Sequence, residues 1–230
     1  MSWIVNFLFK SSLGQKLVMS LSGLFLILFL VIHLLGNLQL MSSDGGKSFN
    51  IYAYFMTHNP LIKLVSYALY ASILIHTIQG LYLYFMNRKA KGSQYAVSTT
   101  KGASIFSRYM AHLGTIIFVF IIIHLYQFWL KMKLGQLPEL NYQGYDHVFQ
   151  DLYTPVVDAY KNIGTVIFYV FCMLIIAFHL WHGFQSAFQS LGLNHKKYTP
   201  LIKFIGILYA ILIPLGFAII PIYLYLNYAA

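Results

Sequence analysis

The chain has 230 residues, of which 59% are hydrophobic and only 9% are charged, and its formal net charge is +10. This composition excludes a soluble globular protein, because most of the chain must face lipid or other apolar helices. It also excludes a nucleic-acid-binding protein, since no soluble basic domain is present to carry the positive charge. We therefore expect one integral membrane domain that covers residues 1–230.

Five apolar segments are long enough to cross a bilayer as helices. They cover approximately residues 17–40, 60–86, 104–130, 163–190 and 201–226. The first segment is too long for a signal peptide and has no small-residue cleavage motif, so we expect a retained span. Pro60 and Pro200 mark helix starts, and Pro214 and Pro221 are expected to kink the fifth helix. The predicted fold is an all-α membrane protein with five transmembrane helices.

The charged residues of the loops predict how the chain is oriented. One side carries the basic residues Lys10, Lys16, Arg88, Lys89, Lys91, Lys101, Arg108, Lys196, Lys197 and Lys203. The other side carries the acidic residues Asp44, Glu139, Asp146, Asp151 and Asp158. The positive-inside rule then places the N-terminus in the cytoplasm and the C-terminus outside, as expected in the inner membrane of a bacterium. The outer loop from Leu134 to Lys161 is expected to form an interfacial cap.

Four histidines, His33, His76, His124 and His179, each lie deep inside a different span. A buried imidazole is costly in hydrocarbon unless it is satisfied, so such residues indicate a functional site. At about 1.5 Å of rise per residue, His33 and His124 lie about 25 Å from the basic side, and His76 and His179 lie nearer to it. The single cysteine, Cys172, allows no intramolecular disulfide or thiolate cluster, so a redox centre must use histidine.

Pairing the histidines by depth joins His33 with His124 and His76 with His179. Each pair comes from alternate helices, which face one another across an up-and-down four-helix bundle. A b-type haem binds between two such imidazoles, and its flat ring would fill the core of the bundle. We therefore predict that the first four helices form a haem-binding bundle with two haem b groups stacked along the membrane normal.

Glycines recur at fixed distances from these histidines. Gly23 and Gly114 precede His33 and His124 by the same spacing, which places them near the level of the cytoplasmic-side haem on the two helices that do not ligate it. A missing side chain there would let the ring edge approach the backbone. Gly80 and Gly183, one turn beyond His76 and His179, could leave room beside the porphyrin; close helix packing is the alternative explanation for all four.

Two histidines of the fourth span are candidates for the fourth ligand, because His182 lies on nearly the same helical face as His179. We prefer His179 because its spacing to Gly183 repeats that of His76 to Gly80; His182 could instead bind a haem propionate or a quinone. A quinone site needs hydrogen-bond donors within an apolar cleft. The candidates are Asn37, Gln39 and His58 on the outer side and Ser22, Arg108, His112 and His182 on the inner side.

These motifs together resemble a known family. Gly14-Gln-Lys followed by Ser22-Gly23 and His33, Ile75-His76-x3-Gly80-x-Tyr82, Gly114-x9-His124 and Phe178-His179-x3-Gly183 are similar to the dihaem cytochrome b membrane anchor of succinate dehydrogenase and fumarate reductase. The resemblance covers nearly the whole chain. It implies the ligand set His33, His76, His124 and His179, and an electron-transfer subunit that performs no dicarboxylate chemistry by itself.

The resemblance also implies the partners of the chain. A flavoprotein and an iron–sulfur protein would dock on the cytoplasmic side, and a quinone, by family analogy menaquinone, would react within the membrane. Three alternatives remain open: a dihaem subunit of another quinol-oxidising enzyme or a stand-alone electron shuttle; a histidine-lined metal or proton transporter; and a purely structural anchor. Transporters usually carry carboxylates near the midplane, and no Asp or Glu lies in any predicted span here.

Overall fold

The computed structural model describes residues 3–90 and 105–229 and is almost entirely helical. Within these residues, five helices are long and apolar enough to cross a membrane, so the prediction of five spans is confirmed. Lys91, Lys101 and the predicted start of the third span at residue 104 lie outside the described residues, as does the side chain of Arg108.

The long helices begin and end within a few residues of the predicted spans. After the short helix α1 (Trp3–Lys10) come α2 (Ser12–Leu38), α4 (Pro60–Ala90), α5 (Ile105–His124), α8 (Ile163–Ser190) and α9 (Thr199–Tyr228). Helix α5 continues through a π-helical turn, η2 (Leu125–Trp129), into α6 (Leu130–Lys133). Helix α9 runs on through Pro214 and Pro221, which lie inside it.

Local sequence signals fix several helix ends. The Ser11 side chain accepts a hydrogen bond from the backbone N–H of Gly14 at 2.9 Å, and the Asn162 side chain accepts one from Thr165 at 3.2 Å. Both satisfy N–H groups that the first turn of a helix leaves free. Gly192, with a φ of +76°, follows the end of α8, in the left-handed conformation that glycine adopts at low cost.

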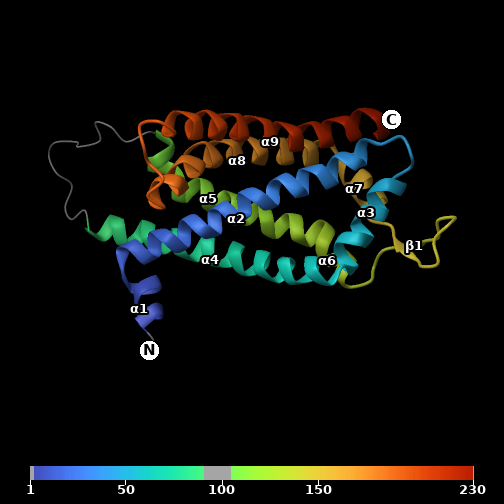
Figure 1. Cartoon of the computed structure of the whole chain (residues 1–230). Coiled ribbons are helices and arrows are strands. Elements are labelled where there is room, and N and C mark those ends of the chain that lie inside the picture. The colour runs from blue at the N-terminus through green and yellow to red at the C-terminus, as the bar shows by residue number, and fades with distance from the viewer. Residues whose placement is uncertain (1–2, 91–104, 230) are drawn as a thin grey trace.

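Four of the long helices form a closed bundle. Helix α2 packs against α4 and α8, and α5 packs against α8 and α4, so that α2 lies diagonally opposite α5, and α4 opposite α8. Helix α9 lies outside this ring along α8, and it also contacts α2 (Figure 1). The phenolic O–H of Tyr209 in α9 donates to the backbone carbonyl of Ile27 in α2 at 2.5 Å.

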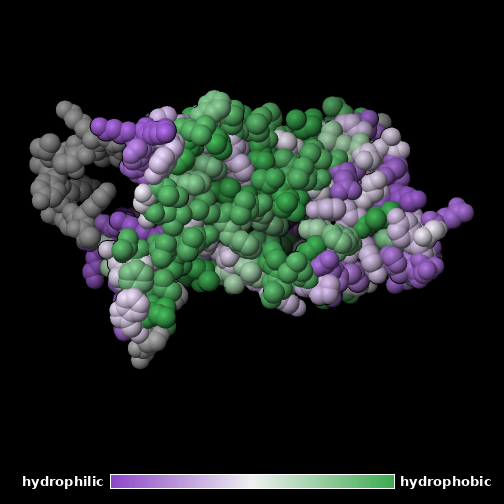
Figure 2. Space-filling view, in the orientation of Figure 1, coloured by the Kyte–Doolittle hydropathy of each residue, from purple (hydrophilic) through white to green (hydrophobic). Residues whose placement is uncertain are grey.

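The two ends of the bundle differ. At one end α2, α5 and α9 begin and α4 and α8 end; it carries Lys10, Lys16, Arg88, Lys89, Lys196, Lys197 and Lys203, and we call it the basic end. The other, the cap end, is covered by three small elements: α3 (Lys47–His58), the hairpin β1 (Glu139–Leu140) with β2 (Phe149–Gln150), and α7 (Tyr153–Tyr160). The visible surface is a hydrophobic band between hydrophilic ends (Figure 2), as a membrane protein requires.

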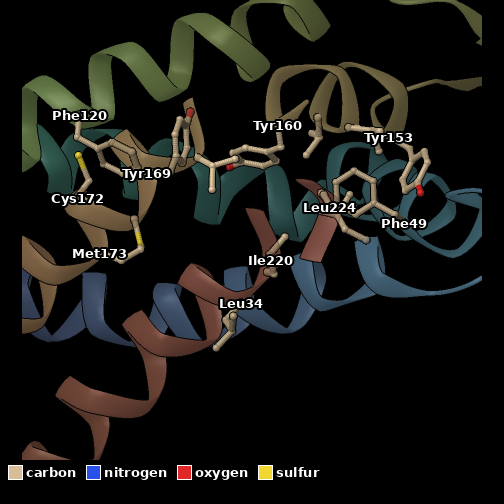
Figure 3. Packing of buried hydrophobic residues seen from close by; sticks show 14 residues of the cluster. Leu34, Phe49, Phe120, Tyr153, Tyr160, Tyr169, Cys172, Met173, Ile220 and Leu224 are labelled. Atoms are coloured by element: carbon tan, nitrogen blue, oxygen red, sulfur yellow. The ribbon is translucent and has the colours of Figure 1, made fainter. Parts of the chain in front are cut away.

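Buried polar groups hold the cap together. The Asn50 side chain of α3 accepts hydrogen bonds from the backbone N–H groups of Leu152 (3.0 Å) and Tyr153 (3.1 Å), and donates to the hydroxyl of Tyr142 at 3.0 Å. Tyr160 and Tyr169 pack in one hydrophobic cluster with Phe120, Cys172 and other buried residues (Figure 3). The predicted interfacial cap is therefore a folded unit that closes one end of the bundle.

Candidate functional site: two histidine pairs in a common cavity

The structure brings the four span histidines together in two pairs. The ring centres of His33 in α2 and His124 in α5 lie 5.9 Å apart, with their planes at 85°. Those of His76 in α4 and His179 in α8 lie 6.3 Å apart, with their planes at 70°. The two pairs belong to the two diagonals of the bundle, as the depth argument predicts. We call them the cap-end pair (His33 and His124) and the basic-end pair (His76 and His179).

The two ring-centre distances are close to the spacing of imidazoles that share one metal ion. Two imidazoles on opposite sides of an ion, each with a metal–nitrogen distance of about 2.0 Å, place their ring centres about 6.3 Å apart. In the described part of the chain, no group of three or more His, Cys, Asp or Glu residues could hold a metal ion. Zinc sites need three or four protein ligands, whereas a haem iron already has four from its macrocycle and needs only two axial ligands. The donor set therefore fits haem iron better than a bare ion.

A large cavity connects the two pairs. It measures about 1820 Å³ and is lined by all four imidazoles. Sites for a single small molecule usually measure about 300–1,000 Å³, so this cavity has room for two large groups. Its walls are formed mostly by apolar and aromatic side chains of α2, α4, α5 and α8. An apolar cavity with imidazoles at two levels suits flat, mostly apolar cofactors.

Two glycines lie directly against the basic-end pair. A Cβ atom on Gly23 would lie 3.1 Å from Cε1 of His76, and one on Gly114 would lie 3.6 Å from Cε1 of His179. Both glycines therefore lie at the level of His76 and His179. Gly80 and Gly183 lie instead against the methyl groups of Met19 and Met110, at 3.3 and 3.4 Å from a built Cβ.

Polar contacts orient two of the four imidazoles. The Ser22 hydroxyl donates to the Val18 carbonyl at 2.8 Å, and its oxygen lies 3.2 Å from Nδ1 of His76. When Nδ1 of His76 donates to the Ser22 oxygen, the Nε2 lone pair of His76 is free to bind a metal. The Asn37 amide donates to the His33 carbonyl at 2.7 Å and lies 3.3 Å from Nδ1 of the same residue.

The other two imidazoles are held by packing. Nδ1 of His124 and Nδ1 of His179 are buried without a hydrogen-bond partner in the described part of the chain. Buried polar atoms are normally paired, so these two unpaired nitrogens mark His124 and His179 as candidates for a functional role. With Nδ1 turned into the protein, Nε2 is the nitrogen that remains available to the cavity.

The remaining histidines and quinone candidates fall into two groups, those that line the cavity and those that do not. His182 lines the cavity, but its Nε2 lies 3.1 Å from the Ser186 hydroxyl, and it is His179 that faces His76. Of the other candidates Asn37 lines the cavity, whereas His112 is outside its lining and lies beside Tyr84 and Tyr109. The cavity lining also omits Ser22, Gln39 and His58.

Outside the bundle, His58 lines a smaller, almost entirely apolar cavity of about 360 Å³ within the cap. There the rings of His58 and His147 each stack on Tyr54, with ring-centre distances of 3.9 and 4.1 Å.

Sequence reasoning missed two features of the site. Met19 and Met110 occupy equivalent positions against Gly80 and Gly183, and each stands four residues before Gly23 or Gly114, so the repeat is Met-x3-Gly-x9-His. Comparing the flanks of the two histidines would have revealed it. The π-helical turn directly after His124 has no such signal in the sequence; π turns often occur at functional sites.

Comparison with known proteins adds no assignment. No family model, curated protein or solved structure matches the chain.

Proposed function

We propose that the chain is the dihaem cytochrome b membrane subunit of a succinate:quinone oxidoreductase, a complex of the succinate dehydrogenase and fumarate reductase family. One observation carries this proposal: two pairs of imidazoles face each other across the two diagonals of one bundle. Their ring centres are 5.9 and 6.3 Å apart. A haem bound at each pair would supply one-electron redox chemistry at two depths of the membrane. The sequence motifs from Gly14 to Gly183 resemble this family, which supports the same conclusion.

The residues of the bundle have separate tasks in this proposal. His76 and His179 hold the first haem, and His33 and His124 hold the second. Ser22 fixes the tautomer of His76, and Gly23 and Gly114 admit the imidazoles of the first pair close to the backbone. The apolar walls of the cavity exclude water, which keeps the imidazoles neutral and therefore able to bind iron.

The basic end is the proposed docking side for the flavoprotein and the iron–sulfur protein. It is the end nearer to His76 and His179, so an electron from a docked partner would have the shorter path to that pair. Its lysines and arginines suit an acidic partner surface. By the positive-inside rule this end is cytoplasmic, and the cap end faces the outside of a bacterial inner membrane.

The quinone, proposed to be menaquinone, would react within the membrane. Asn37 and His182 are the candidate donors that line the cavity, near the cap-end and the basic-end pair respectively. Neither carries a charge that would resist burial, and each has a hydrogen-bonding side chain, which a quinone carbonyl requires.

The test is a count of haem in the purified membrane complex. The pyridine haemochrome spectrum should give two b-type haems per chain, and a flavin-containing subunit should copurify. Two haems without a flavoprotein would favour a dihaem subunit of another quinol-oxidising enzyme. A chain without haem would refute the proposal, and the histidine pairs would then be tested as a metal or proton path by flux assays in vesicles.

A further inference from the structure

The charges around the cavity are all of one sign. Its lining includes three charged side chains, Lys16, Lys63 and Lys133, and no carboxylate. Within the described residues, the ion pair between Lys161 and Asp158 is the only salt bridge, so none of the three lysines is neutralised by the protein. All three are exposed residues that also line the cavity, so their positive charges would attract an anionic group at its edge.

Two of these lysines lie at the cap end. Gly23 contacts His76, and His33 lies ten residues further along α2, so the cap-end pair is about 15 Å beyond the basic-end pair. Lys63 precedes His76 by thirteen residues, which places its backbone about 5 Å beyond the cap-end pair. Lys133 follows His124 by nine residues, about 13 Å further toward the cap. The flexible side chains of both residues can reach the space between these two levels.

We propose that Lys63 and Lys133 bind the carboxylates of the haem held by His33 and His124; this inference rests on the proposed function. A haem b carries two carboxylates on one edge, and two lysines on different helices could each bind one. The positive charges would then orient the haem with its carboxylates toward the cap and stabilise the reduced state of its iron. Lys16, at the basic end of the cavity, is placed to serve the other haem in the same way.

Anionic lipid is the competing source of negative charge, because lysines near helix ends often extend to phosphate headgroups. The lining of the cavity favours haem. Lys131 lies two residues before Lys133 on the same short helix, but it does not line the cavity. A position at the end of this helix is therefore not enough to bring a lysine to the cavity. Lys131 therefore provides a matched control.

The experiment is a redox titration of the purified complex, with each haem followed at its α band. The cap-end haem is identified as the one lost in His33→Ala. The double variant Lys63→Met/Lys133→Met should keep two haems and shift the redox equilibrium of the cap-end haem toward the oxidised state by at least tenfold, about 59 mV for one electron. The basic-end haem should stay at its wild-type potential. Lys131→Met and Lys63→Arg/Lys133→Arg should leave both potentials near wild type.

The outcomes separate the possible failures. Selective loss of the cap-end haem in the double methionine variant, restored in the double arginine variant, would also support the proposal. Unchanged potentials with less bound phospholipid phosphorus would show that the lysines bind lipid, and would overturn it. Equal shifts in Lys131→Met would overturn it as well, as a general charge effect. A wild-type complex without haem would instead refute the proposed function itself.

Discussion

The two histidine pairs use the same donors but fix them by different means. The basic-end pair is surrounded by small groups, with Gly23 and Gly114 against its rings and Ser22 on one nitrogen. The cap-end pair is surrounded by aromatic rings. They belong to Phe29, Phe217, Phe120, Phe128 and Tyr169, at 5.0 to 6.2 Å between ring centres. Added volume should therefore disturb the basic-end pair, and lost volume should disturb the cap-end pair.

If the two pairs bind haem as proposed, the largest effect is expected from changing the four histidines. His76→Ala or His179→Ala should remove the basic-end haem and block electron transfer from the docked subunits, whereas His33→Ala or His124→Ala should remove only the cap-end haem. The haem content should fall from two to one per chain, and the optical and electron paramagnetic resonance signals of the remaining haem should show which of the two is lost.

The control for the ligand series is His112→Ala. His112 lies on α5 like His124 but is outside the cavity lining, so this variant should keep both haems. If His76→Ala retained two haems of unchanged spectra, the pairing of the imidazoles across the bundle would be wrong.

Hydropathy and helical rise were enough to predict the five spans and the two levels of histidine. Both follow from one-dimensional quantities: a bilayer fixes the length of a helix, and a constant rise converts residue number into depth. The choice between His179 and His182 was harder, because residues three apart share a helical face, and only the packing of α4 against its neighbours decides which ring faces His76.

The cap was predicted as a location but not as a structure. Helix α3 lies between two spans and is too short to cross a membrane, and it is held by contacts of Asn50 with residues about a hundred positions away. Such long-range polar contacts leave no local pattern. The aromatic surround of the cap-end pair was equally hidden, because nineteen phenylalanines and nineteen tyrosines give too many candidates.

Removing an aromatic ring should weaken the cap-end pair selectively. Phe120 is buried, with its ring centre 5.8 Å from that of His124 and 5.2 Å from that of Tyr169. Phe120→Ala should leave a cavity that costs about 3 kcal/mol of stability, and the cap-end haem should dissociate faster on transfer to apomyoglobin. Val119→Ala on the exposed face of the same helix is the control and should change the rate little. A faster loss of the basic-end haem instead would contradict the comparison.

Adding a methyl group to a glycine beside the basic-end pair should disturb that pair and leave the cap-end pair unchanged. A Cβ on Gly23 would lie 3.1 Å from the His76 ring, closer than most such contacts, whereas one on Gly114 would make ordinary contact with His179 at 3.6 Å. Gly23→Ala should therefore displace the His76 ring and lower the stability of the protein by about 1 kcal/mol. It should change the electron paramagnetic resonance spectrum of the basic-end haem alone. Gly114→Ala serves as the matched variant and should have nearly wild-type spectra. Equal effects of both would show that the contact distance is not what matters.

The smallest effect concerns the cap, where a carboxylate holds the start of α3. Asp44 accepts hydrogen bonds from the hydroxyl and backbone N–H of Ser48 and from the N–H of Gly46, and these bonds lower the pKa of its carboxyl below the usual value. Because the folded pKa is lowered, the stabilisation is present above the unfolded pKa near 4 and is lost as pH falls through the folded pKa. Asp44 is exposed, so its contribution is about 0.5 kcal/mol or less.

Hydrogen exchange at the first turn of α3 measures this contribution directly. Exchange rates at residues 47–50, corrected for the intrinsic effect of pH, should rise as the pH is lowered below about 4, while those in α7 keep their protection. Asp44→Asn should show the raised exchange already at neutral pH and should lose most of the dependence on pH. Both haem spectra should stay unchanged, because the carboxylate holds the rim of the cap and not the histidine pairs. Exchange that rose equally in α3 and α7 would mean that the cap opens as one unit around Asn50. Asp44 would then stabilise the whole cap and not only the start of α3.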